Sequence, residues 1–130
     1  MTENDPLASV LSNITNAEAK GKKECLVHPS SKIIKQILKT LKENGYIKEF
    51  EEISKERGGT IKIQLVGKIN KCNVIKPRYS FTKKDYEKYE KRYLPAKNFG
   101  IIIVTTSKGI MRHDLAIEKG LGGKLLAYCY

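Results

Sequence analysis

The apolar residues of this 130-residue chain recur with two different periods, so its fold must contain both helices and strands. A helical spacing joins Ile33, Ile34, Ile37, Leu38 and Leu41. An alternating spacing joins Ile61, Ile63 and Leu65, as in a strand with one buried face. The two patterns predict an α/β protein of the α+β kind, and the changes of pattern along the chain divide it into two small lobes.

Residues 1–67 are predicted to form an N-terminal α/β lobe with the order helix, strand, helix, strand, strand. Asp5-Pro6 supplies a cap and a first-turn proline for the first helix, and Asn44-Gly45 ends the second. The predicted elements are a helix from Pro6 to near Gly21, a strand at 25–27, a helix that begins after Ser30 or Ser31, a strand at 46–53, a turn at 55–59, and a strand that contains Ile61, Ile63 and Leu65. The last two strands are expected to form a hairpin.

Residues 68–130 are predicted to form a C-terminal lobe that is mostly β, with short helices. The segment from Gly67 to Asn73 is interpreted as a connector, with Asn73 as a left-handed turn residue. The predicted elements after it are a strand at 74–81, a charged helix from about Lys83 to Tyr93, a strand at 100–106, a short helix at 114–119 and a strand at 125–130.

The formal net charge of +11 is concentrated in the middle of the chain, because residues 62–97 carry eleven Lys or Arg and only three Asp or Glu. Such a field attracts nucleic acid or an anionic membrane. The longest apolar run, Ile101–Val104, is too short to span a bilayer, so we expect no membrane partner. Asp5-Pro6 falls where a signal peptide would need an apolar run, and we therefore expect a cytoplasmic protein.

The residues that most often carry catalysis or bind metals form no recognisable motif. Cys25, Cys72 and Cys129 contain no Cys-x-x-Cys pair, which argues against a zinc site or a disulfide framework. His28 and His113 lie far apart in sequence and outside any nucleophile or metal motif. We therefore expect no catalytic residue, no metal and no cofactor.

The segment Thr105-Thr106-Ser107-Lys108-Gly109 concentrates hydroxyl donors, a cation and a glycine after an apolar strand, and Gly122-Gly123-Lys124 follows the next short helix. Hydroxyl groups can donate to phosphate or ribose oxygens, and glycine lets a polyanion approach the backbone. The alternative is a strand end whose hydroxyls satisfy nearby backbone groups. A P-loop is disfavoured, because Lys108 precedes the glycine.

Other candidate contacts for a polyanion lie along the basic part of the chain and at one helix start. They are Ser30, Ser31, Lys32, Lys76, Arg78, Lys83 and Lys88. Simple helix capping is the alternative for the two serines. Tyr86, Tyr89 and Tyr93 share one face of the charged helix, which favours core packing over a platform for stacking bases.

Motifs along nearly the whole chain resemble those of one family. They are Asp5-Pro6-Leu7-Ala8, Pro29-Ser30-Ser31-Lys32, Gly67 to Cys72, Ile75-Lys76-Pro77-Arg78, Thr105 to Met111, Gly120 to Lys124, and Tyr128-Cys129-Tyr130. On these residues the chain resembles the universal small-subunit ribosomal protein eight, the S-eight family, in its archaeal and eukaryotic form.

This resemblance implies a structural constituent of the small ribosomal subunit without enzymatic activity. It implies primary binding to an irregular helix in the central domain of the small-subunit RNA, and a part in assembling the platform. The implied partners are that RNA, neighbouring small-subunit ribosomal proteins and, for some members, their own messenger RNA. The implied state is a monomer within the ribosome in the cytoplasm, with the main RNA contact on the C-terminal lobe.

Carried over residue by residue, the resemblance implies that Thr105, Thr106 and Ser107 hold the core of the RNA helix. Gly122 and Gly123 would permit close approach, and Lys108 and Lys124 would neutralise phosphates. The chain departs from the family pattern with Thr105 in place of a common Ser. It also has Arg112 where a small hydroxyl residue is common, so the cap of the last helix is expected to pass to His113 or Asp114.

Two other classes of function stay open at the level of sequence. A nucleotide-phosphate enzyme would use the hydroxyl segment and Lys108, and saturable mononucleotide binding or turnover would reveal it. A protein-interaction module would present the charged helix to an acidic partner, and association without RNA would reveal that function.

Overall fold

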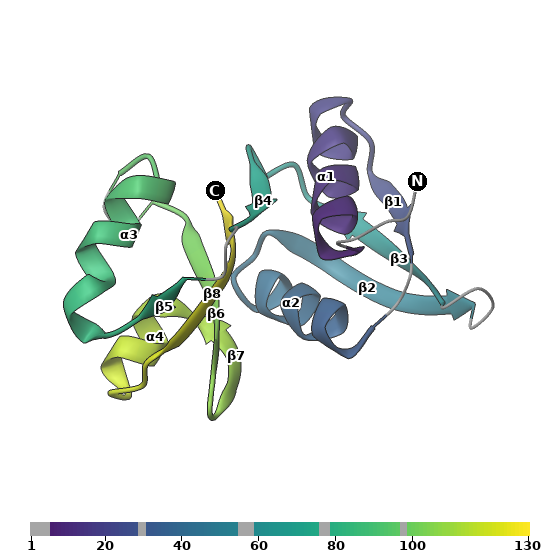
Figure 1. Ribbon diagram of the computed structural model, residues 1–130. Coiled ribbons are helices and arrows are strands. Elements are labelled where there is room, and N and C mark those ends of the chain that lie inside the picture. Colours follow the sequence, from purple (N-terminus) through teal and green to yellow (C-terminus); the bar gives the residue numbers. More distant parts are fainter. Residues whose placement is uncertain (1–5, 29–30, 55–58, 76–78, 97–98) are drawn as a thin grey trace. The chain divides into compact units, whose positions relative to one another are not determined.

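The computed structural model describes residues 6–28, 31–54, 59–75, 79–96 and 99–130, with the side chains of Pro6, Lys83 and Tyr86 outside the description. The chain forms two compact units, Met1–Cys72 and Asn73–Tyr130 (Figure 1). Each combines helices with an antiparallel sheet, which confirms the predicted α+β class. The unit boundary follows Cys72, whereas the sequence places the boundary between the lobes after Gly67; the lobes as separate domains stay a prediction.

The N-terminal unit contains the five predicted elements in the predicted order. They are α1 (Pro6–Ala19), β1 (Glu24–Val27), α2 (Lys32–Glu43), β2 (Ile47–Ser54) and β3 (Thr60–Leu65). The strands form an antiparallel sheet of order β1-β3-β2. Most of the predicted turn at 55–59, residues 55–58, lies outside the described residues.

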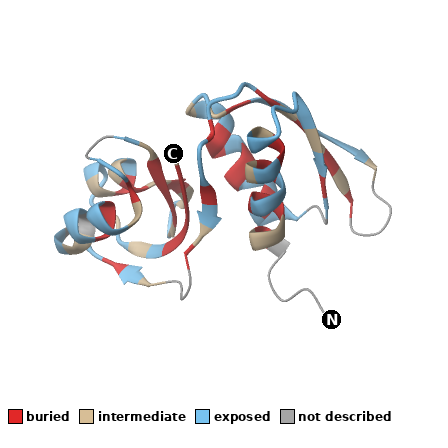
Figure 2. Ribbon diagram, turned by 90° about the horizontal axis from the view of Figure 1, so that it is seen from above, coloured by how far each residue is buried: buried red, intermediate tan, exposed pale blue. Residues whose placement is uncertain are grey.

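The two apolar periods of this unit build its core. Along β3, Ile61, Ile63 and Leu65 are buried while the residues between them are partly exposed. Four of the five predicted apolar residues of α2 are buried, and Figure 2 shows this alternation of buried and exposed residues along the elements. The prediction for Ile33 is wrong, because its side chain is 40% exposed. Successive residues of a helix point about 100° apart, so in the first turn of α2 the Ile33 side chain faces solvent while that of Ile34 faces the core.

Residues just after β3 stay attached to the N-terminal unit through α1. The Glu18 carboxylate accepts hydrogen bonds from the backbone N–H of Gly67 (3.3 Å) and Ile69 (3.1 Å). The Thr15 hydroxyl donates to the Cys72 carbonyl and accepts from the Cys72 N–H. These bonds explain why the unit extends to Cys72.

The C-terminal unit is built around a mostly antiparallel sheet with short helices. Its elements are β4 (Cys72–Val74), β5 (Ser80–Phe81), η2 (Lys83–Asp85, a 3₁₀ turn), α3 (Tyr86–Tyr93), β6 (Ile101–Thr106), β7 (Gly109–Arg112), α4 (His113–Glu118) and β8 (Gly123–Cys129). The sheet order is β4-β8-β6-β7, and β5 also pairs with β8.

Three local predictions for this unit are corrected. The strand predicted at 74–81 is two short strands, β4 and β5, each of which pairs separately. Asn73 lies within β4 and is not a turn residue. The strand β7 was not predicted, because only Met111 of its four residues is buried and so short a segment shows no period.

The core of the C-terminal unit forms where α3 and α4 pack on the sheet. The buried cluster contains Ile75, Phe81, Tyr89, Leu94, Ile102, Val104, Met111, Ala116, Leu125 and Tyr128. Tyr93 is partly buried against it. Core packing is therefore confirmed for Tyr89 and Tyr93. Within the described residues, no helix has the length and apolar character needed to cross a bilayer.

Candidate nucleic-acid interface

The hydroxyl segment forms the end of a β-hairpin between β6 and β7. Thr106 pairs with Gly109, so Ser107 and Lys108 form the turn. Gly109 has a φ of 113°, which favours glycine. The Thr106 hydroxyl donates to the Gly109 carbonyl (2.9 Å) and accepts from the Lys108 N–H (3.1 Å). This hydroxyl therefore holds the turn in shape.

The strand β8 brings the second predicted segment beside this hairpin. Thr105 pairs with Lys124, and Thr106 pairs with Gly123. On the other side of β8, Ser80 pairs with Lys124. Directly opposed residues of neighbouring strands project from the same face of a sheet. Ser80, Lys124 and Thr105 therefore form a polar row across three strands. The sequence did not identify Ser80 as a member of this row.

The groups that point outward at this end of the sheet are hydrogen-bond donors and cations. Ser80, Ser107, Lys108 and Lys124 are exposed, and Thr105 is partly exposed. Within the described part of the chain, the hydroxyls of Thr105 and Ser107 make no hydrogen bond. This donor row, which we define as Ser80, Thr105, Ser107, Lys108 and Lys124, can bind the oxygens of an anionic polymer.

The fold itself requires glycine at the start of β8. A Cβ atom at Gly123 would overlap the backbone carbonyl oxygen of Thr105. At Gly122 a Cβ would lie 3.0 Å from the carbonyl oxygen of Phe81. The close approach of the β6 backbone to β8 therefore explains why residue 123 is a glycine. The sequence alone did not reveal this structural requirement.

Arg112 is held by its neighbour on α4. Its guanidinium donates from Nε to Asp114 Oδ1 and from a terminal nitrogen to Oδ2, both at 2.6 Å. Asp114 Oδ1 also accepts from the Leu115 N–H at 2.8 Å. The N-cap position of α4 is Arg112, and its side chain makes no cap hydrogen bond, so the expectation that the cap passes to His113 or Asp114 is wrong. Both residues lie inside the first turn of α4, where the Asp114 carboxylate accepts from the next N–H.

The Asp114 carboxylate gives a pH-dependent prediction. Burial alone raises the pKa of Asp114, but the hydrogen bonds and charge of Arg112 outweigh it and hold this pKa below the ordinary 3.8. The stabilisation is present above the unfolded-state pKa and is lost as pH falls through the folded-state pKa. We expect Asp114→Asn to be less stable than the parent protein at neutral pH, and the difference to disappear in acid.

Urea unfolding at a series of pH values measures this effect. Glu118→Gln is the matched control, because that carboxylate is exposed on the same helix. A stability difference for Asp114→Asn that stays constant into acid would contradict the assignment.

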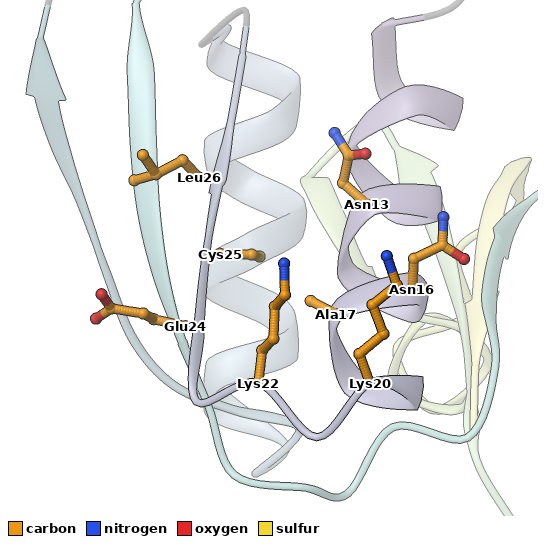
Figure 3. Close-up of a pocket in the computed structure, with 8 residues that line it drawn as sticks. All are labelled: Asn13, Asn16, Ala17, Lys20, Lys22, Glu24, Cys25 and Leu26. Atoms are coloured by element: carbon orange, nitrogen blue, oxygen red, sulfur yellow. The ribbon is translucent and has the colours of Figure 1, made fainter.

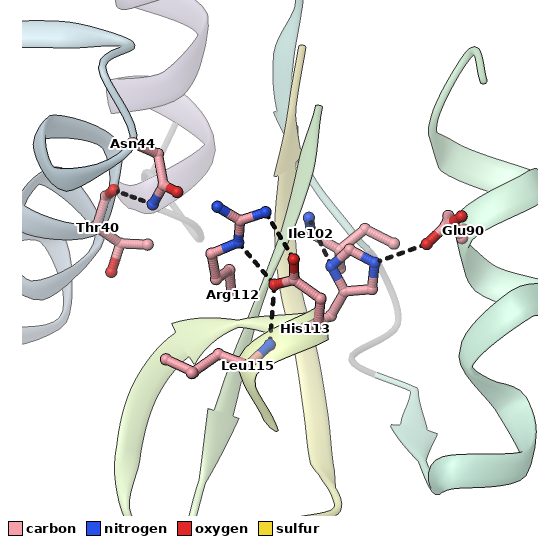
Figure 4. Close-up of polar contacts among 8 residues, drawn as sticks. Thr40, Asn44, Glu90, Ile102, Arg112, His113 and Leu115 are labelled. Atoms are coloured by element: carbon pink, nitrogen blue, oxygen red, sulfur yellow. Dashed lines mark hydrogen bonds and ion pairs between the residues drawn. The ribbon is translucent and has the colours of Figure 1, made fainter. Parts of the chain in front are cut away.

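A buried histidine–glutamate pair joins α3, α4 and β6 (Figure 4). His113 Nδ1 accepts from the Ile102 N–H at 3.3 Å, and His113 Nε2 lies 3.2 Å from Glu90 Oε2. Since Nδ1 accepts a hydrogen bond, the ring proton must be on Nε2, which donates to the carboxylate. His113 and Glu90 are only 5% and 7% exposed. The pair therefore links α3, α4 and β6 within the core of the C-terminal unit.

The other predicted contact residues belong to other elements of the two units or lie outside the described residues. The Ser31 hydroxyl accepts from the Ile34 N–H at 3.2 Å and caps α2, and Lys32 is exposed beside it. Lys88 is exposed on α3, which Figure 1 draws well apart from the β6–β7 turn. Lys83 lies in η2. The predicted contacts outside the described residues are Ser30, Lys76 and Arg78, together with the side chain of Lys83.

A pocket of about 470 Å³ between α1 and β1 was not predicted (Figure 3). Asn13, Asn16, Lys20 and Lys22 line it together with Cys25. Burial, with the nearby Glu18 charge, raises the pKa of the Cys25 thiol to about 11, so the thiol is a poor nucleophile at neutral pH. Cys25, Cys72 and Cys129 form no disulfide, and the described residues contain no group of three or more His, Cys, Asp or Glu able to hold a metal ion.

A strongly basic net charge and an exposed row of hydrogen-bond donors on an α+β fold are typical of one class of protein, the small proteins that bind nucleic acid. The chain matches the family model of ribosomal protein S8 over residues 5–130, and it belongs to that family. It is therefore a structural protein of the small ribosomal subunit that binds ribosomal RNA and works in translation. The family is not known as a family of enzymes.

Proposed function

We propose that this protein binds an irregular helix in the central domain of the small-subunit RNA and helps to assemble the platform of the subunit. The observation that supports this most is the register of β6 with β8, which places Thr105 beside Lys124 next to the Ser107-Lys108 turn. In this proposal Thr105 and Ser107 donate to the RNA, Thr106 and Gly109 hold the turn, and Lys108 and Lys124 neutralise phosphates.

The chemistry of an RNA helix favours short, rigid donors. A-form RNA hides its base edges in a deep groove, so proteins recognise shape, ribose hydroxyls and unstacked bases. Ser and Thr side chains on a hairpin have few rotamers to lose on binding. Lysines then add affinity that depends on salt. The donor row combines both kinds of group.

The remaining predicted residues are assigned to weaker contacts with the RNA backbone. These are Lys88 and Lys83, then Lys76 and Arg78, and, at the start of α2, Ser30, Ser31 and Lys32. Gly122 and Gly123 would let the RNA approach β8. The protein would act as a monomer in the cytoplasmic ribosome, beside neighbouring small-subunit proteins. Its own messenger RNA would be bound only if the transcript folds into a similar irregular helix.

Binding to a short transcript of the central-domain helix, compared with a regular duplex of equal length over a salt series, tests the proposal. We expect a preference for the irregular helix that survives added salt, because hydroxyl contacts release few counterions. Equal binding to both RNAs that salt abolishes would reject it. The 5′ part of the messenger RNA, used as a competitor, tests autoregulation in the same assay.

Replacing Ser107 by alanine tests the hairpin contact. The exposed hydroxyl has no partner among the described residues, so its removal leaves the fold intact but leaves an RNA group unsatisfied. We expect a loss of about 1–3 kcal/mol in binding to the irregular helix. Ser12→Ala, at an exposed serine of α1, is the matched control. Equal affinities of the two variants would exclude this role for Ser107.

A further inference from the structure

We propose that Arg92 binds a phosphate of the RNA backbone, at a second contact separate from the donor row; this inference rests on the proposed RNA-binding function. Arg92 is exposed on α3. Its guanidinium carbon lies 5.3 Å from the centre of the Tyr79 ring and 5.5 Å from the centre of the Tyr93 ring. Both distances are within the range of a cation–π interaction.

Two further ring contacts hold these tyrosines in place. Tyr79 stacks with the buried Tyr89 at 5.8 Å between ring centres, and Tyr93 stacks with Tyr128 at 5.4 Å. Tyr89 and Tyr128 belong to the buried core of the unit. Arg92 therefore lies on a rigid aromatic support, although the residue itself is on the surface.

The guanidinium of Arg92 has no carboxylate partner in the described part of the chain, in contrast to the other described arginine. Arg112 is satisfied by both oxygens of Asp114. On α3, the Glu90 carboxylate is buried against His113. The donors of Arg92 are therefore available to an external anion.

The geometry suits a phosphate. Ring contacts occupy the faces of a guanidinium and leave its N–H edge for hydrogen bonds. That edge matches two phosphate oxygens, and a supported side chain loses little entropy on binding. One turn earlier, Lys88 Nζ lies 5.4 Å from the centre of the Tyr89 ring, so a second cation stands on the same aromatic surface. The excess of basic residues in 62–97 favours a polyanionic partner, and membership of a family that binds ribosomal RNA favours RNA over an acidic protein.

Equilibrium binding of Arg92→Ala to the irregular helix and to the regular duplex tests this contact. We expect roughly tenfold weaker binding to both RNAs, because a charged hydrogen bond to phosphate carries no sequence information. The slope of affinity against salt should fall by about 1. Lys91→Ala is the control, since Lys91 is the adjacent exposed cation and makes no ring contact within the described residues. It should change affinity less than twofold, in the manner of a solvated charge.

Variants of Arg92 and Tyr79 distinguish the contribution of a guanidinium supported by aromatic rings from the contribution of its charge alone. Arg92→Lys keeps the charge but loses the planar fork, so it should keep the salt slope and still bind several-fold more weakly. Tyr79→Phe keeps the ring and should bind like the parent, whereas Tyr79→Leu removes one of the two supporting rings but keeps the Arg92 charge, so like Arg92→Lys it should bind more weakly with the salt slope unchanged. Thermal unfolding confirms that each variant is folded.

Equal affinities of Arg92→Ala and Lys91→Ala would overturn the proposal. A greater loss of binding to polyglutamate than to RNA would also overturn it, in favour of an acidic protein partner. The proposed function is judged separately, by the preference of the parent protein for the irregular helix. If the parent protein showed no such preference, the proposed function would fail, but the effect of Arg92→Ala on binding to both RNAs could still be measured.

Discussion

Replacing Gly123 by alanine is expected to lower the free energy of unfolding by about 3 kcal/mol, at the upper end of the usual cost of overpacking. The added Cβ would overlap the Thr105 carbonyl oxygen, and a backbone atom cannot move aside as a flexible side chain can. The pairing of Thr105 with Lys124 would be displaced. RNA affinity should therefore fall together with stability, as measured by urea unfolding and by equilibrium binding.

Gly122→Ala is the matched control for this experiment. Its Cβ would meet only the Phe81 carbonyl oxygen, at 3.0 Å, so a smaller loss of stability is expected. If Gly123→Ala lost RNA affinity but kept the stability of the parent, the glycine would serve the approach of RNA and not the packing of β8 on β6.

Replacing His113 by leucine is expected to lower the free energy of unfolding by about 3–5 kcal/mol, the usual cost of breaking a buried pair from one side. The substitution leaves the Glu90 carboxylate without its partner in the core and removes the acceptor for the Ile102 N–H. Because the pair joins α3 to α4 and β6, the whole C-terminal unit should unfold more readily. Urea unfolding monitored by far-UV circular dichroism measures the change.

Two other variants test the reason for this loss. Glu90→Gln keeps a side-chain oxygen that accepts from His113 Nε2 and should be tolerated far better than His113→Leu. The double variant Glu90→Leu with His113→Leu removes both polar partners and should recover part of the lost stability. A double variant less stable than His113→Leu would contradict the explanation.

Elements with a clear local signal could be predicted from the sequence. The helix α2 has a periodic apolar face and has Asn44 as its C-cap, at the predicted end, and β3 alternates along its whole length. The predictions failed where short segments depend on distant partners. β4, β5 and β7 contain two to four residues each, and such strands exist only because β8 and β6 supply their hydrogen bonds.

The candidate site shows the same division. The sequence drew attention to the residues from Thr105 to Gly109 and from Gly122 to Lys124, because their types suit an anionic polymer. It could not show that the Thr106 hydroxyl is engaged in the turn, or that Ser80 joins Lys124 across two strands. It also did not single out Arg92, since the rings that support it come from residues as far apart as Tyr79 and Tyr93.

By itself the sequence determined the class of fold, the sign and place of the charge, and the family, because each depends on residue types and on spacings within one element. The tertiary structure alone decided which of these residues act together. The register of β8 on β6 placed Lys124 beside Thr105, and the packing of α3 placed Arg92 over two rings. The physical reason is that strand register and side-chain packing minimise free energy over contacts between distant segments, which no local period encodes.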